Sequence, residues 1–138
     1  MSKPAVILMD NRDDRREVWT ALIRGLDPIR RVDFLDWCCN LLRATTTGPS
    51  FVMIQNARAD REKMYLLVRA AWRGDAAADM ILTNQIYADI TGLGHQWGLC
   101  LATVAVELES WAKGREPTPP ELFRPGSSDA LSAPARPS

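Results

Sequence analysis

The sequence has little of what usually identifies a function at once. It contains one histidine, three cysteines, and 17 basic residues against 17 acidic ones. An odd number of cysteines without metal-ligand spacing favours neither a disulfide framework nor a zinc site, so we expect no metal and no cofactor. A net charge of zero removes the global field that draws a protein to nucleic acid or to an anionic membrane. We therefore expect neither of these as a partner.

Long apolar runs are also missing. Residues 5–9 are too few for the core of a signal peptide, and no run approaches the roughly 20 residues that span a bilayer. Since the cysteines show no disulfide pattern, a reducing cytoplasm is the expected location. His95 has no Ser, Cys or Asp partner at motif spacing, which argues against a catalytic triad.

The 138 residues suffice for one domain with a core of its own. The composition changes after Gly114, because six of the nine prolines fall in residues 115–138. Such a segment has too few large apolar groups to offset its ordering entropy. We expect a folded domain over residues 1–114 and a disordered, proline-rich tail over residues 115–138.

The first 114 residues alternate between short apolar runs and helix-like stretches. The runs of strand length are residues 5–9, 32–35, 51–54 and 80–82. Helices are predicted between and after them, at residues 13–25, 36–44, 59–73, 85–91 and 105–113. Residues 86–104 permit both strand and helix, with 99–104 as a fifth strand. The alternation predicts an α/β fold with helices on both faces of a parallel sheet.

The helix predicted over residues 59–73 has a clear apolar stripe. Met64, Leu67, Val68 and Ala71 recur at helical spacing and are expected to face the core, and Gly74 suits the end of the helix.

With this layout, residues 4–114 resemble the response-regulator receiver family. Residues 6–11 (VILMDN) look like its first strand and acidic loop, residues 49–55 (PSFVMIQ) like its third strand, and residues 80–84 (MILTN) like its fourth. The resemblance implies a flavodoxin-like, doubly wound, five-stranded parallel sheet with strand order 2-1-3-4-5. It also assigns roles to four residues: the metal position to Asp10 and Asn11, the phosphoacceptor position to Gln55, and the switch hydroxyl to Thr83.

Three departures from the family pattern concern its chemistry. Gln55 is an amide and cannot form an acyl phosphate, and Asn11 replaces one of two acids expected to hold Mg²⁺. The lysine that binds the phosphoryl group is absent too, because no lysine lies between Lys63 and Lys113. The pattern predicts a pseudo-receiver that is neither phosphorylated nor an enzyme. It would act through protein–protein interaction in a two-component-type or related regulatory pathway.

The expected partner is a protein, with a second copy of the chain as one candidate. Tryptophan and tyrosine are favoured interface anchors, and the residues proposed for the interface are Ile86, Tyr87, Ile90, Leu93 and Trp97. The same residues could equally cover the sheet. The alternative function is a small flavodoxin-like ligand-binding protein or enzyme that uses the polar cluster at the strand ends.

Overall fold

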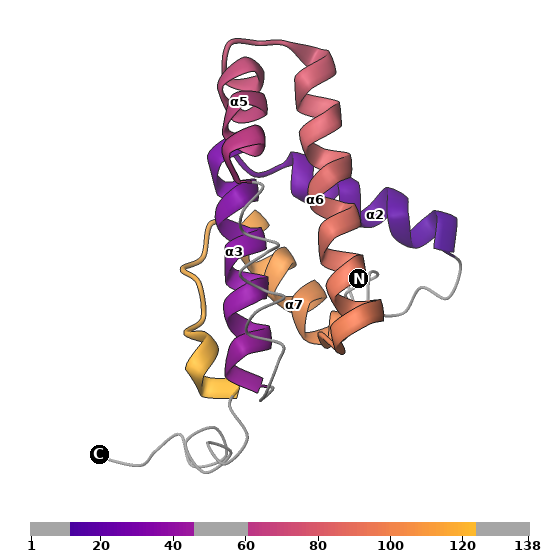
Figure 1. The fold of residues 1–138 in the computed structure, drawn as a ribbon, viewed down its shortest axis with the longest axis vertical. Coiled ribbons are helices and arrows are strands. Elements are labelled where there is room, and N and C mark those ends of the chain that lie inside the picture. Colours follow the sequence, from indigo (N-terminus) through magenta and orange to yellow (C-terminus); the bar gives the residue numbers. More distant parts are fainter. Residues whose placement is uncertain (1–11, 46–60, 124–138) are drawn as a thin grey trace.

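The computed structural model of the protein describes residues 12–45 and 61–123. Within these two ranges the chain forms helices joined by short turns, and no strand occurs in them. The elements, shown in Figure 1, are α2 (Arg12–Arg24), α3 (Pro28–Thr45), α5 (Arg61–Trp72), α6 (Ala76–Trp97), α7 (Leu101–Ala112) and the 3₁₀ helix η1 (Pro120–Phe123).

The prediction of an α/β fold is therefore wrong, and the flavodoxin-like sheet is wrong with it. Residues 32–35 lie in α3 and residues 80–82 lie in α6, although both runs have the length of a strand. Most of the proposed fifth strand, residues 99–104, belongs to the first turn of α7. The remaining two predicted strands, residues 5–9 and 51–54, lie outside the described residues.

The predicted helices fare better. Those expected over residues 13–25 and 59–73 are confirmed as α2 and α5. Those expected over residues 36–44 and 85–91 fall within the longer helices α3 and α6, and the one expected over residues 105–113 overlaps α7, which begins earlier and ends at Ala112.

α3 lies at the centre of the fold and packs against α2, α5, α6 and η1. Because neighbours cover it on several sides, its apolar residues spread around the helix instead of forming one stripe. A helix buried in this way has the near-continuous apolar character of a buried parallel strand, which explains the error at residues 32–35. Its nine buried residues are Arg31, Val32, Phe34, Leu35, Trp37, Cys38, Cys39, Leu41 and Leu42.

α5 and α6 form a helical hairpin at one end of the molecule (Figure 1). Gly74, with φ of 96°, makes the turn after α5, as expected for a residue that must adopt a left-handed conformation. Asp75 then caps α6: its Oδ1 accepts hydrogen bonds from the backbone N–H groups of Ala77 and Ala78, at 3.0 and 3.1 Å.

The turn between α6 and α7 is set by two glycines. Gly98 ends α6 with φ of 80°, a left-handed conformation that favours glycine. Gly94 lies where α7 approaches α6, and a Cβ atom added to it would be 2.9 Å from Cγ of Leu101. Gly98 therefore serves a helix end and Gly94 a close approach between helices.

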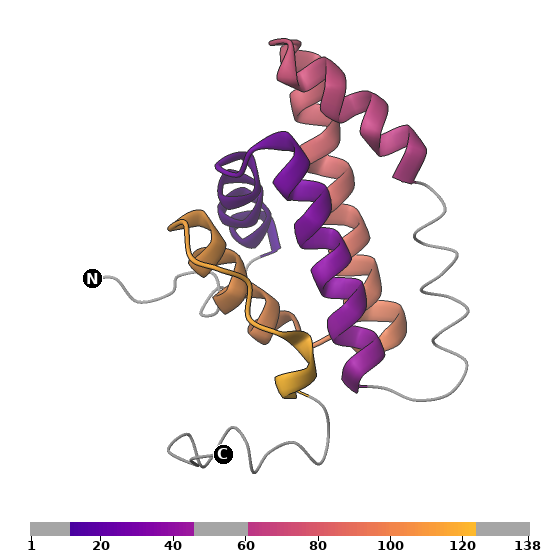
Figure 2. The same cartoon turned by 90° about the vertical axis from the view of Figure 1, so that its left-hand side faces the viewer.

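Residues 115–123, which we call the strap, return along α7 toward the C-terminal end of α3 (Figure 2). They consist of an extended stretch followed by η1, which packs against α3. The strap is the described part of the predicted tail, and residues 124–138 lie outside the described residues.

Among the helices that the structure describes, none combines the length and apolar character needed to cross a lipid bilayer.

Candidate interaction surface

The residues assigned to the receiver site do not form a site in the described structure. Asp10, Asn11 and Gln55 lie outside the described residues. Thr83 is buried in α6, where its hydroxyl donates to the backbone oxygen of Asp79 at 2.9 Å and accepts from Nη1 of Arg31 at 3.1 Å. Its hydroxyl belongs to an interhelical network and is not at the end of a strand.

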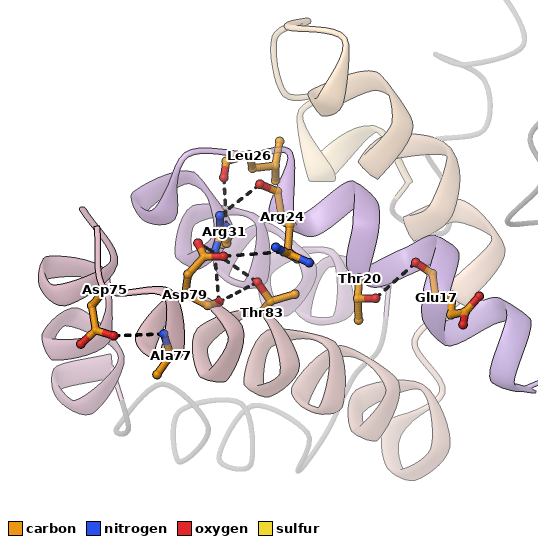
Figure 3. Close-up of polar contacts among 9 residues, drawn as sticks. All are labelled: Glu17, Thr20, Arg24, Leu26, Arg31, Asp75, Ala77, Asp79 and Thr83. Atoms are coloured by element: carbon orange, nitrogen blue, oxygen red, sulfur yellow. Dashed lines mark hydrogen bonds and ion pairs between the residues drawn. The ribbon is translucent and has the colours of Figure 1, made fainter. Parts of the chain in front are cut away.

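That network is centred on the guanidinium of Arg31 and is drawn in Figure 3. Nη1 lies 2.8 Å from Oδ1 of Asp79, so α3 and α6 are joined by an ion pair. Nε donates to the carbonyl oxygen of Leu26 at 3.0 Å, and Nη2 donates to that of Arg24 at 3.1 Å. The last carbonyls of a helix have no partner within the helix, so Arg31 both satisfies the C-terminal end of α2 and fixes the start of α3.

The residues proposed for a partner interface mostly fill the core. Ile86, Ile90 and Leu93 are buried, and Tyr87 and Trp97 are partly buried and pack against the same core. In the folded chain these five side chains therefore contact neighbouring helices.

The first turn of α5 is anchored to α3. Arg61 is buried, and its Nη2 and Nε lie 2.8 and 2.9 Å from Oδ1 of Asp36. Met64 is buried one turn later, and Leu67 and Val68 pack against the core. Three residues of the predicted stripe, Met64, Leu67 and Val68, thus face the core, whereas Ala71 is only partly buried, and α5 is anchored along one side.

Outside this core-facing stripe α5 exposes three large apolar side chains. Leu66 and Trp72 each retain 64% of their accessible surface, and Tyr65 retains 41%. In a helix, residues four and seven apart lie on one face, so Tyr65, Arg69 and Trp72 form one line with Leu66 beside it. Arg73 directly follows the helix, and its N–H still donates to the carbonyl oxygen of Arg69. We call these five residues the α5 face.

The neighbouring helix of the hairpin also exposes apolar side chains. Met80 and Ile81, near the start of α6, retain 56% and 53% of their surface. Single exposed apolar residues are normal on soluble proteins, but a group of them on one end of a molecule indicates a contact surface.

A signal for the α5 face was present in the sequence. The stripe of Met64, Leu67 and Val68 accounts for the core side of the helix, which leaves Tyr65, Leu66 and Trp72 on the other side. An amphipathic helix normally has polar residues there.

The three cysteines differ in their surroundings. Burial, with the neighbouring Cys39 thiol and the carboxylates of Glu107 and Asp36 as further causes, raises the pKa of the Cys38 thiol well above its ordinary value. Cys100 is exposed before α7, and a hydrogen bond from the Thr103 hydroxyl at 3.3 Å lowers its pKa, aided by backbone amides. In the described residues no three His, Cys, Asp or Glu side chains are placed to hold a metal ion.

Comparison with models of protein families, with curated proteins and with solved structures finds no match for this chain.

Proposed function

We propose that the protein is a helical binding module that docks a partner protein through the α5 face. The observation that carries this proposal is the outward position of Tyr65, Leu66 and Trp72 on a helix whose other side is fixed to the core. The proposal retains the protein–protein interaction expected from the sequence and moves it from α6 to α5.

The composition of the α5 face supports a protein interface. Binding energy at protein interfaces is concentrated in few residues, and tryptophan, tyrosine and arginine are the types most enriched among them. The α5 face presents one tryptophan, one tyrosine and two arginines around Leu66.

The anchoring of α5 supports it as well. The ion pair of Arg61 with Asp36 and the buried side chain of Met64 fix the helix before any partner arrives. A surface that is already ordered loses less conformational entropy on binding, which leaves more of the contact energy as affinity.

The arginines indicate the chemistry of the partner. Arg69 lies between Tyr65 and Trp72 on the same face, and Arg73 lies one turn from Arg69 beside Leu66. Complementary charge steers association and excludes wrong partners. Glu62, four residues before Leu66 and seven before Arg69, is exposed on the same side. We therefore assign a partner whose docking surface has an apolar centre, with aspartate or glutamate opposite the two arginines.

Photocrosslinking in the cells that express the protein tests the proposal. A photoreactive phenylalanine analogue replaces Trp72 in one full-length chain and Val106, which is exposed on α7, in a control chain. We expect a discrete protein adduct from position 72 and none from position 106. The captured protein, once purified, should bind the Val106→Ala chain as well as the wild type. It should bind the Trp72→Ala chain about 30-fold more weakly, as for truncation of a hot-spot residue.

Three outcomes would contradict the proposal. Equal adducts from positions 72 and 106 would show that the α5 face is not selective. Adducts with lipid alone would make it a membrane-contacting surface. An adduct of twice the mass of the chain would make it the interface of a homodimer.

A further inference from the structure

Both backbone polar groups of Thr118, in the middle of the strap, are held by buried side chains of the helices. Its N–H donates to Oε2 of Glu107 on α7 at 2.7 Å. Its carbonyl oxygen accepts from Nε1 of Trp37 on α3, also at 2.7 Å. Trp37 and Glu107 each retain only 5% of their accessible surface.

The two hydrogen bonds match the sequence of the strap. Thr118 lies between Pro117 and Pro119-Pro120, and proline has no N–H. Thr118 therefore supplies the one N–H group of this four-residue stretch, and the carboxylate of Glu107 accepts from it. An ionised acceptor makes a stronger hydrogen bond than a neutral one, and the prolines restrict φ, so little entropy is lost when the stretch is held extended.

Aromatic side chains surround this contact. The ring of Trp37 stacks on Phe34, with centroids 5.8 Å apart, and Phe34 meets Trp111 edge to face at 5.1 Å. Phe123, at the end of the strap, meets Trp37 edge to face at 6.3 Å. Nε1 of Trp111 donates to the same oxygen of Glu107 at 3.0 Å. Grooves lined with aromatic side chains are the usual receptors for extended proline-rich peptides.

Two hollows flank the point where the strap is held. A hollow of about 460 Å³ lies where the strap leaves α7, lined by residues that include Arg30, Asp33 and Glu116. A second hollow of about 300 Å³ lies between Arg43 of α3 and Glu121 of η1. Gly114, with φ of 83°, forms the turn between α7 and the strap. Rotation at this turn would release the strap while α2, α3, α5, α6 and α7 stay packed, at the cost of the contacts that η1 and Phe123 make with α3.

We propose that the groove between α3 and α7 is a binding site for a proline-rich peptide segment, occupied in the monomer by the strap of the same chain and open to the strap of a second copy. A second copy fits because its strap presents the same prolines, the same Thr118 N–H and the same Phe123. Exchange of an identical element between protomers preserves every contact and needs only a turn that can open. At low protein concentration the chain's own strap occupies the groove in preference to the strap of a second copy, because its effective concentration is in the millimolar range.

Peptide binding to a full-length chain with a weakened strap tests the site. Thr118→Pro removes the N–H that Glu107 accepts and leaves the groove intact. A fluorescent peptide of residues 115–123 should bind this chain at least about tenfold more tightly than it binds the wild type, whose own strap competes. A matched peptide carrying Thr118→Pro should bind at least about tenfold more weakly, since the buried carboxylate of Glu107 then loses the Thr118 N–H and keeps only the donor of Trp111. Adding Trp37→Phe to the receptor chain should weaken binding about fivefold, the effect of one neutral hydrogen bond.

Equal binding of the two peptides would overturn the site, and so would equal binding of the first peptide to the wild-type and Thr118→Pro chains.

Hydrogen exchange of the unaltered chain provides a second test that does not depend on the folding of a variant. The Thr118 amide should exchange at least about tenfold faster than the amides of Leu35 and Leu42 in α3, because the strap opens locally. Exchange as slow as in α3 would show that the strap opens only when the whole chain unfolds, which would overturn the proposal.

Sedimentation of the wild-type chain tests the second copy as occupant. A dimer should form as the concentration approaches the millimolar range, and Thr118→Pro should abolish it while Trp72→Ala leaves it unchanged. A chain that remains monomeric over that range would overturn the assignment to a second copy. A dimer that is lost with Trp72→Ala and kept with Thr118→Pro would overturn it as well, because the α5 face would then join the copies.

Discussion

α3 and α5 both pack against α6, yet they place their apolar residues very differently. Nine residues of α3 are buried, whereas in α5 only Arg61 and Met64 are buried and three large apolar side chains face outward. Each helix also has a buried arginine near its start that pairs with an aspartate of another helix, at 2.8 Å in both cases. The two helices are therefore anchored alike but exposed differently. The difference separates residues that maintain the fold from residues that are available for binding.

The largest expected contrast concerns thiol reactivity. Cys38 lies in α3, where burial raises its pKa, and Cys100 is exposed, with a pKa lowered by the hydrogen bond from Thr103. Only the thiolate reacts, so Cys100 should be alkylated in the folded chain. Cys38 should react only when the chain unfolds, at a rate at least about 1000-fold lower for a stable domain.

The pH dependence of the reaction checks the cause. Because its pKa is lowered, Cys100 should reach half its maximal rate at a lower pH than a free cysteine does, and Thr103→Val should move that midpoint upward. Mass spectrometry of the alkylated peptides measures both rates. Comparable labelling of Cys38 in the folded chain would show that α3 is not the inaccessible centre.

A matched pair of aromatic truncations should affect stability next. Phe34 of α3 is fully buried against Trp37 and Trp111, so Phe34→Ala should lower the free energy of unfolding by about 3–5 kcal/mol. Tyr65 of α5 is exposed, so Tyr65→Ala should change it by less than about 1 kcal/mol. Urea denaturation followed by circular dichroism gives both values, and similar losses would contradict the comparison.

The two arginines that contact Asp79 should also differ in how much they stabilise the fold, the buried one more than the exposed one. Arg31→Ala removes a buried guanidinium and leaves Asp79, Thr83 and two helix-end carbonyls without it, which should cost about 3 kcal/mol. Arg24 is exposed, with its Nε 3.6 Å from Oδ2 of Asp79, so Arg24→Ala should cost less than about 1 kcal/mol. Thermal unfolding of the two variants provides the comparison. A larger loss with Arg24→Ala would mean that the ion pair on the surface, and not the buried network, joins α3 to α6.

The smallest effect on stability is expected on the α5 face. Trp72→Ala removes a side chain that is mostly exposed, so the free energy of unfolding should change by no more than about 0.5 kcal/mol. The same substitution should weaken partner binding strongly, as proposed above. A clear loss of stability would place Trp72 in the fold and remove it from the proposed interface.

The sequence predicted α5 correctly and misread α3 in part, for a physical reason. α5 contacts the core with one side only, so Met64, Leu67 and Val68 recur at helical spacing and the helix can be recognised. α3 has neighbours on several sides, so three of the four residues 32–35 are buried and only Asp33 is exposed, which leaves a short run that resembles a buried strand. The helical period is therefore clear for an element covered on one side and weak for an element covered on several.

The candidate site was missed for a related reason. The predicted sheet placed a site at polar residues that follow its strands, such as Thr83. Without a sheet in the described residues these positions share no common edge, and Thr83 belongs to a buried network. Glu107 and Thr118 lie eleven residues apart, and their contact depends on how the strap turns at Gly114. No local pattern in the sequence encodes that contact.

The close approach of α6 and α7 at Gly94 has an evolutionary consequence. Because a Cβ at position 94 would be 2.9 Å from the side chain of Leu101, the volumes of these two positions are coupled. Among related sequences we expect an alanine or serine at position 94 to occur together with a smaller residue at position 101, while a bulky residue at 101 occurs only with glycine at 94. This correlated variation would indicate, from an alignment of homologues alone, that the two helices cross at these positions.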